Sequence, residues 1–257
     1  MSKAYDPVDW RFLEDVFTAM GFPVFFRRLV FICVSTPWFS IMMNDTYKGF
    51  FKSKRGLRQG DLLSPYLFII LEEVFSWLLK KRMADSHHFY NPVGAPRISH
   101  LLYTDDVMIF ANASKRSIRC LMGVLHDFEK WSGQRVSHEK SAIFFSKQLR
   151  LSRKREILAD IGFVEGKFPF TYLGVPIVDG KLKASHFGPL LEKIGKKVPG
   201  WKCRLLSQGG RLILLRHVLS SMPMHLLSAL HVPKIVFKKL QGLFSNFSWG
   251  EQGGKSK

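Results

Sequence analysis

Residues 103–106 read Tyr103-Thr104-Asp105-Asp106, between two short apolar runs at 98–103 and 107–111. Apolar runs around such a short polar break are typical of a tight β-hairpin. Because the strands would hold the turn rigidly, the carboxylates of Asp105 and Asp106 form a candidate site for a hard divalent cation, with Mg²⁺ as the natural candidate. Aspartate is also common in turns for its own hydrogen bonding, so the pair alone supports a purely structural role equally well.

A second informative stretch, residues 55–61, reads Arg-Gly-Leu-Arg-Gln-Gly-Asp. Its two guanidinium groups, planar amide and two glycines could closely approach phosphates and a base edge. An ordinary basic connector is the alternative. Ser64 can cap and Pro65 can open a helix directly after this loop, and the apolar stripe that follows predicts that the helix is mostly buried.

Apolar periodicity predicts the remaining elements. Strands and helices interleave up to about residue 180, and basic helices alone follow, so the fold class predicted is α+β with a boundary near 180. The expected helices are 10–20, 24–33, 114–132, 152–161, 185–198, 207–220 and 233–247, with Pro199, Pro223 and Pro233 dividing the last three, and the other expected strands are 39–44, 47–51, 136–145 and 171–177.

The composition points to a polyanionic partner. Lys and Arg total 39 against 20 Asp and Glu, which gives a formal net charge of +19. A nucleic acid explains this excess better than solubility does. The alternative is a ribosome-associated or aggregation-prone chain whose basicity marks no particular site.

The sequence disfavours several other classes of protein. The three cysteines, Cys33, Cys120 and Cys203, form no close pair, so neither a zinc site nor a disulfide framework is indicated, and a reducing intracellular compartment fits. Charged residues and a proline interrupt the apolar stretches 22–43 and 62–79, which predicts core segments and no membrane association. No secretory leader follows Met1.

Together the motifs resemble the reverse transcriptase family, specifically the plant LINE-type (non-LTR) polymerases. Residues 2–10 are similar to the end of the family's first catalytic motif, which typically reads D-x-S-K-A-Y-D-R-V-D-W. Residues 55–65 match the second motif and 103–106 the third. Residues 132–133 with 139–141 resemble the fourth motif, and 172–176 resemble the primer-side strand that follows it. The family's thumb is resembled by Trp201, 206–207, 210–211 and 247–249.

The resemblance implies two-metal nucleotidyl transfer, with two Mg²⁺ ions, deoxynucleoside triphosphates, and an RNA template with a DNA primer or an RNA–DNA hybrid. It also implies roles for particular residues. Tyr5 would exclude the ribose 2′-hydroxyl, although core packing is its alternative, and Lys140 would donate a proton to pyrophosphate, although it could be a solvated lysine. The remaining implied residues are Asp105 and Asp106 for metal, Arg58, Gln59 and Gly60 for the nucleotide, and Arg55, Lys202 and Arg211 for nucleic acid.

The family pattern also predicts a layout. A palm, with helices packed on a central antiparallel sheet that bears Asp105 and Asp106, would cover 1–180 and include a remnant of the fingers at about 35–60. A helical thumb would cover 181–250 and a frayed tail 251–257, with the fingers mostly absent. The first catalytic aspartate would precede Met1, so the chain is expected to be inactive alone. A non-catalytic nucleic-acid-binding remnant or a pseudogene product are the alternatives, and a nuclear location is implied by family. The sequence departs from the pattern at Pro7, Leu62, Glu72, Thr104 and Ser137.

Overall fold

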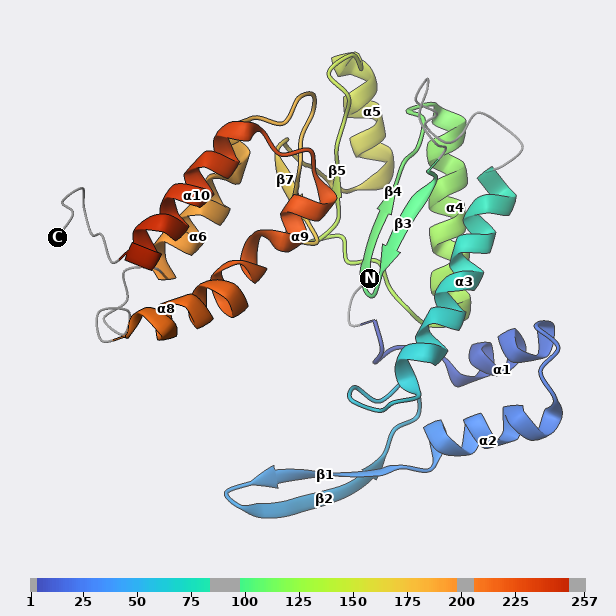
Figure 1. Cartoon of the computed structure of the whole chain (residues 1–257). Coiled ribbons are helices and arrows are strands. Elements are labelled where there is room, and N and C mark those ends of the chain that lie inside the picture. Colours follow the sequence, from blue (N-terminus) through green and yellow to red (C-terminus); the bar gives the residue numbers. More distant parts are fainter. Residues whose placement is uncertain (1–3, 84–97, 198–205, 250–257) are drawn as a thin grey trace. The chain divides into compact units, whose positions relative to one another are not determined.

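A computed structural model of the 257-residue chain describes residues 4–83, 98–197 and 206–249 (Figure 1). The chain divides into two compact units, 1–165 and 166–257. This division falls earlier in the chain than the boundary near residue 180 that the sequence predicts. The layout of palm, fingers and thumb stays a prediction, and the tail 251–257 lies outside the described residues.

The first unit contains five helices and three two-stranded sheets among its described residues. Its helices are α1 (Trp10–Ala19), α2 (Val24–Ser35), α3 (Ser64–Met83), α4 (Lys115–Ser132) and α5 (Leu151–Ile161), and its strands are β1 (Trp38–Met43), β2 (Thr46–Lys52), β3 (His100–Tyr103), β4 (Asp106–Ile109), β5 (Ala142–Ile143) and β6 (Val164–Glu165).

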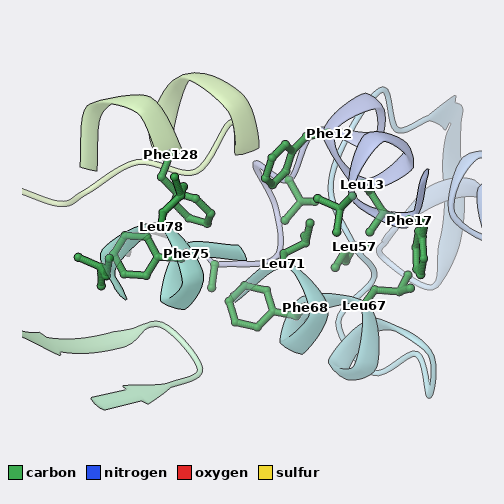
Figure 2. Packing of buried hydrophobic residues seen from close by; sticks show 14 of the residues in the cluster. Phe12, Leu13, Phe17, Leu57, Leu67, Phe68, Leu71, Phe75, Leu78 and Phe128 are labelled. Atoms are coloured by element: carbon green, nitrogen blue, oxygen red, sulfur yellow. The ribbon is translucent and has the colours of Figure 1, made fainter. Parts of the chain in front are cut away.

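The core of the first unit lies where α3 packs against α1 and α4. Figure 2 shows Leu71 and Phe75 of α3 facing Leu13 of α1 and Phe128 of α4. The Phe75 and Phe128 rings are in contact, with centroids 4.8 Å apart. Both rings are fully buried, and burial of such large apolar side chains is the main force that holds the three helices together.

The predicted helix at 114–132 is confirmed, and its ends follow from local chemistry. Ser114 caps α4 by accepting a hydrogen bond from the Ser117 amide at 3.1 Å. At the other end Gly133 adopts φ 75°, a left-handed conformation that favours glycine, and its amide donates to the Glu129 carbonyl. α4 is therefore fixed in length at both ends.

The predicted hairpin around Asp105 and Asp106 is confirmed as the antiparallel pair β3–β4. A larger antiparallel sheet around it is not present among the described residues, where every sheet has two strands and β5–β6 is parallel. The strand expected at 136–145 shrinks to Ala142–Ile143. The Val136 amide donates to the Glu129 carboxylate at 2.6 Å and the Ser141 amide to the Ser137 carbonyl at 2.9 Å, which takes these amides out of any strand ladder.

The second unit is mostly helical. It contains β7 (Phe170–Tyr172), β8 (Val175–Ile177), the 3₁₀ turn η1 (Ala184–Phe187), α6 (Gly188–Lys197), α8 (Gln208–Leu214), the π-helical turn η2 (Leu215–Leu219), α9 (Ser221–Ala229) and α10 (Lys234–Trp249). Its core is formed by Phe187, Ile194, Leu219, Val236, Leu240 and Phe247.

Pro223 does not divide the helices of this unit as its position in the sequence suggests. It lies in the first turn of α9, which continues α8 and η2 without a break in the helical run. Just before it, in the π-helical turn, the Ser220 amide donates to the Leu215 carbonyl, five residues earlier, and the Ser221 hydroxyl donates to the Val218 carbonyl at 2.8 Å.

The helical run 208–229 is, by length and composition only, apolar enough to cross a membrane. It carries Arg211 and Arg216, and its Leu219 is 4% exposed within the core of the second unit. A single helix that meets this test of length and composition is weak evidence for a membrane.

Glu72 is the one charged residue buried in the core of α3 among the described residues, and it generates a testable prediction. Burial raises its pKa to about 7. Because the folded state then binds the proton more tightly than the unfolded state, Glu72 becomes increasingly destabilising as the pH rises from 4.5 to about 7. We expect Glu72→Gln to raise the free energy of unfolding at pH above 7 by at most roughly 3 kcal/mol, with little effect near the acid end of that window.

Thermal unfolding followed by circular dichroism across this pH range measures the effect. Glu73→Gln is the matched control, because Glu73 is the exposed neighbour on the same helix. Equal shifts for both variants, or a pH-independent shift for Glu72→Gln, would contradict the prediction.

Candidate functional site

The segment Tyr5–Trp10 is bound to the loop at 55–61 by four hydrogen bonds, three of which have a backbone carbonyl as acceptor. The Leu57 amide donates to the Tyr5 carbonyl at 2.8 Å, and the Gly56 amide donates to the Val8 carbonyl at 2.8 Å. The Trp10 indole nitrogen Nε1 donates to the Gly56 carbonyl at 2.7 Å. Two motifs about fifty residues apart in the sequence are thus joined mainly through their backbones.

Only glycine fits at position 56. Its φ is +94°, and a Cβ there would lie 2.5 Å from the Asp6 carbonyl oxygen. Beside this contact the Gln59 side-chain nitrogen Nε2 donates to the Asp6 carboxylate oxygen Oδ1 at 3.3 Å. The amide of Gln59 is therefore held at the exposed surface of the loop, beside the first segment.

The end of α4 makes a similar contact with the same segment. The Asp9 amide donates to the Ser132 carbonyl at 2.8 Å, and a Cβ on Gly133 would lie 2.5 Å from the Pro7 carbonyl oxygen. Asp9 also caps α1 by accepting from the Arg11 amide at 2.7 Å. Residues 5–10 consequently contact both the loop at 55–61 and the end of α4.

The β3–β4 turn presents Asp105 and Asp106 at the surface. Tyr103 pairs with Asp106 across the strands, and Thr104 adopts φ 49° in the two-residue turn between them. The Thr104 hydroxyl donates to Asp105 Oδ1 at 3.1 Å. Both carboxylates are exposed and adjacent, on a turn whose length leaves little freedom to its backbone.

A histidine connects this hairpin to α3. The His100 ring nitrogen Nε2 lies 2.9 Å from the Ser76 hydroxyl, and its Nδ1 lies 2.8 Å from the Ser99 hydroxyl. Burial and the nearby Lys80 ammonium hold the pKa of His100 below its usual value. The neutral ring therefore bridges the hairpin that bears the aspartates and the helix that follows the loop at 55–61.

A family model described as reverse transcriptase (RNA-dependent DNA polymerase) matches residues 1–177. The chain belongs to this family. The match covers every motif from the first segment to the strands β7 and β8, so the reverse transcriptase resemblance read from the sequence is confirmed, together with a mixture of helices and small, mostly antiparallel sheets.

Two proteins of Arabidopsis thaliana are similar to this reverse transcriptase chain. A putative ribonuclease H protein is 35% identical over 83 residues, which are 32% of this chain and 13% of that protein. An uncharacterized mitochondrial protein is 33% identical over 132 residues, which are 49% of this chain and 96% of that protein. The chain thus spans only a small part of the first relative and nearly all of the second.

The structure gives the surroundings of the other residues singled out from the sequence. The Tyr5 ring stacks on Phe68, with centroids 4.9 Å apart. Arg55 and Arg58 are exposed, and Lys140 lies in an exposed turn. Arg211 is half-buried in α8 of the second unit, whereas Lys202 lies outside the described residues. The functional roles of these residues stay predictions.

The carboxylates of the turn suit Mg²⁺ chemistry. Mg²⁺ in polymerase sites is bound by one or two carboxylates together with phosphate oxygens and water, which matches the adjacent Asp105 and Asp106. Within the described residues no group of three or more His, Cys, Asp or Glu side chains could hold a metal. Metal binding by Asp105 and Asp106 stays a prediction.

Sequence reasoning did not find the contacts of Asp6, Trp10 and Gly133 with the two motifs. Their only signal is local: Gly56 and Gly133 are glycines within the motif stretches 55–61 and 132–133, and a glycine there can mean close backbone approach. The partner in that approach is distant in sequence, so the pattern alone could not identify it.

Gly56→Ala tests whether the close approach organises the site. We expect it to lower the free energy of unfolding by clearly more than the roughly 1–2 kcal/mol expected from left-handed backbone strain alone, because the methyl group would also displace the Asp6 carbonyl. Urea unfolding measures the difference. Gly21→Ala is the matched control, since Gly21 has φ +77° with no atom within 4 Å of a Cβ. Equal losses for the two variants would refute the role of the contact.

Proposed function

We propose that the chain is the palm and the beginning of the thumb of an RNA-directed DNA polymerase from a non-LTR retrotransposon. The observation that carries this proposal is the attachment of the loop at 55–61 to residues 5–10. It places the Gln59 amide beside Asp6 and the Tyr5 backbone beside Leu57, so that groups suited to a nucleotide come from two motifs at one place.

In this proposal the incoming deoxynucleoside triphosphate contacts Gln59, Gly60 and Arg58. The amide of Gln59 can both donate and accept hydrogen bonds, and Gly60 with φ +85° lets the backbone approach the ligand without a side chain in the way. Tyr5 would limit the space at the sugar, supported by its stack on Phe68. A bulky ring that is held by a second ring is well suited to exclude a 2′-hydroxyl.

Asp105 and Asp106 would hold Mg²⁺, which when bound stabilises negative charge on the attacking and leaving oxygens of phosphoryl transfer. Lys140, exposed in its turn, would give its proton to the leaving pyrophosphate. Arg55, Lys202 and Arg211 would contact the backbone of the RNA template and DNA primer, consistent with the net charge of +19.

Nucleotide binding tests the role of the turn. We expect Mg²⁺ to strengthen binding of a deoxynucleoside triphosphate by about tenfold or more in the parent chain, and expect Asp105→Asn/Asp106→Asn to abolish this gain, because the amides carry no charge to hold the cation. Titration calorimetry with and without Mg²⁺ measures both.

Asp45→Asn is the matched control. Asp45 is also exposed on the two-residue turn of a hairpin of the first unit, with φ 59°. The control should keep the full effect of Mg²⁺. A parent chain with no Mg²⁺-dependent gain, or a control that loses it equally, would contradict the assignment of Asp105 and Asp106.

A second candidate function, nucleic-acid binding without catalysis, is favoured because no group of three or more His, Cys, Asp or Glu side chains in the described part of the chain could hold a metal. We therefore expect no primer extension by these 257 residues alone. An RNA–DNA hybrid should still bind, with affinity falling at least about 100-fold between roughly 50 and 200 mM salt.

Primer extension on an RNA template and fluorescence anisotropy of the labelled hybrid measure the two properties. Asp105→Asn is the control for extension. Arg55→Gln should reduce the slope of log affinity against log salt concentration by about one. Extension by the parent that disappears in Asp105→Asn would disprove inactivity, whereas salt-independent binding would disprove the nucleic-acid role.

A further inference from the structure

The β1–β2 hairpin of the first unit exposes both of its faces. All seven residues of β2 are exposed, and on β1 only Phe39 is half-buried. Figure 1 shows the hairpin as a long two-stranded ribbon that extends away from α2. An isolated hairpin is marginally stable in water, so its own cross-strand side chains must contribute to holding it together.

Those cross-strand contacts are aromatic. The rings of Trp38 and Phe50 stack with centroids 5.3 Å apart and planes at 27°. On the opposite face Phe39 and Phe51 stack with centroids 5.9 Å apart. Trp38 nevertheless remains 56% exposed and Phe50 74% exposed, so the first stack leaves a broad π-surface open to solvent. A surface of this kind can accept another flat ring.

Cations lie beside both stacks. Lys52 pairs with Trp38 in the strand register, and its ammonium nitrogen lies 4.9 Å from the Trp38 ring centroid. The Arg58 guanidinium lies 5.8 Å from the Phe39 ring centroid. Both distances are within the range of cation–π attraction, so the positive charges are held next to the rings.

The charge of the segment selects the kind of ligand. Residues 38–58 contain five Lys and Arg against one Asp, which is a net charge of +4. An apolar protein surface would have to desolvate these cations without offering them a partner. Single-stranded nucleic acid supplies both bases that stack and phosphates that pair with cations, and interleaved aromatic and basic side chains are how proteins bind it.

We propose that the β1–β2 hairpin is a stacking platform for the unpaired part of the RNA template. Bases stack on Trp38 and Phe50, and phosphates lie beside Lys52. The proposal rests on the proposed function, since a template is the single strand that such a polymerase holds. The hairpin leads directly into the loop at 55–61, and Arg58 of that loop packs on Phe39, on the hairpin face opposite the platform.

Binding of the whole 257-residue chain to fluorescein-labelled oligouridine, measured by fluorescence anisotropy, tests the platform. Trp38→Ala/Phe50→Ala should weaken binding by about tenfold or more, because stacking of each base is lost. Trp38→Leu/Phe50→Leu keeps apolar bulk but removes the rings, and it should lose as much. Lys52→Gln should lower the slope of log affinity against log salt concentration by about 0.7, the value for one phosphate contact with a single strand.

A closely matched control is available on the helices of the same unit. Trp77 on α3 is 54% exposed with the Lys81 ammonium nitrogen 4.4 Å from its ring centroid, and Phe25 on α2 is 74% exposed. Trp77→Ala/Phe25→Ala removes two rings as exposed as those of the platform, and should leave affinity within about twofold. An equal loss in this control, or unchanged affinity in either hairpin variant, overturns the proposal.

Two further measurements separate the alternatives. Sedimentation that shows the parent as a dimer and Trp38→Ala/Phe50→Ala as a monomer would make the face a contact between copies of the chain, and would overturn the platform. Strand binding needs no metal, so it is scored independently of the Mg²⁺-dependent nucleotide binding of Asp105 and Asp106. If the chain shows no Mg²⁺-dependent nucleotide binding but the hairpin variants still weaken oligouridine binding, only the polymerase assignment is contradicted. If nucleotide binding depends on Mg²⁺ as expected but the hairpin variants bind oligouridine normally, only the platform is contradicted.

Discussion

The close approach of two glycines to one short segment is the constraint on which the candidate site depends. Gly56 and Gly133 each bring their backbone so near to residues 6 and 7 that a single methyl group would collide with a carbonyl oxygen. Hydrogen bonds from the Gly56, Leu57 and Asp9 amides then satisfy polar groups that would otherwise be lost in this tight packing. The segment 5–10 thereby fixes the loop at 55–61 and the end of α4 relative to each other.

This constraint also links the site to the core. Val8 is fully buried, and Leu57, on the other side of the hydrogen bonds, is 4% exposed in the same cluster as Leu71 and Phe75. The loop is thus exposed at Gln59 and Gly60, whereas Leu57, two residues before Gln59, is buried in the core. A loop of this kind can contact a ligand without having to be ordered by it, because the cost of fixing its backbone is met during folding.

Much of this architecture was predictable from local signals. The turn at Asp105, the capped helix α4 and the hairpin β1–β2 follow from patterns contained within a few residues, and each is confirmed. The expectation that the apolar stretch 22–43 is a core segment was wrong, because most of α2 and β1 is exposed. The strand expected at 136–145 failed because the Glu129 carboxylate, a side chain on the preceding helix, accepts the Val136 amide. Such competition between a side chain and a strand ladder leaves no trace in apolar alternation.

Pro223 failed as a helix boundary for a related reason. Proline disrupts a regular α-helix by removing one amide donor, but Pro223 follows the π-helical turn η2, where the hydrogen-bond pattern already departs from that of a regular α-helix. The contacts of Gly56 with Asp6 and of Gly133 with Pro7 were out of reach for another reason, since both join segments far apart in the sequence and depend on how three helices pack.

The contacts that hold the fold together and the groups proposed for the activity are of different chemical kinds. Most of the bonds that hold residues 5–10 to the loop at 55–61 and the end of α4 come from backbone amides and carbonyls, which every residue except proline can provide. Pro7 contributes a carbonyl beside Gly133 and no donor, so an unusual residue there leaves the frame intact. The metal binding proposed for Asp105 and Asp106 would depend instead on side-chain charge, which one substitution removes. On that proposal, a chain of this family can keep its architecture while a few exposed carboxylates decide its chemistry.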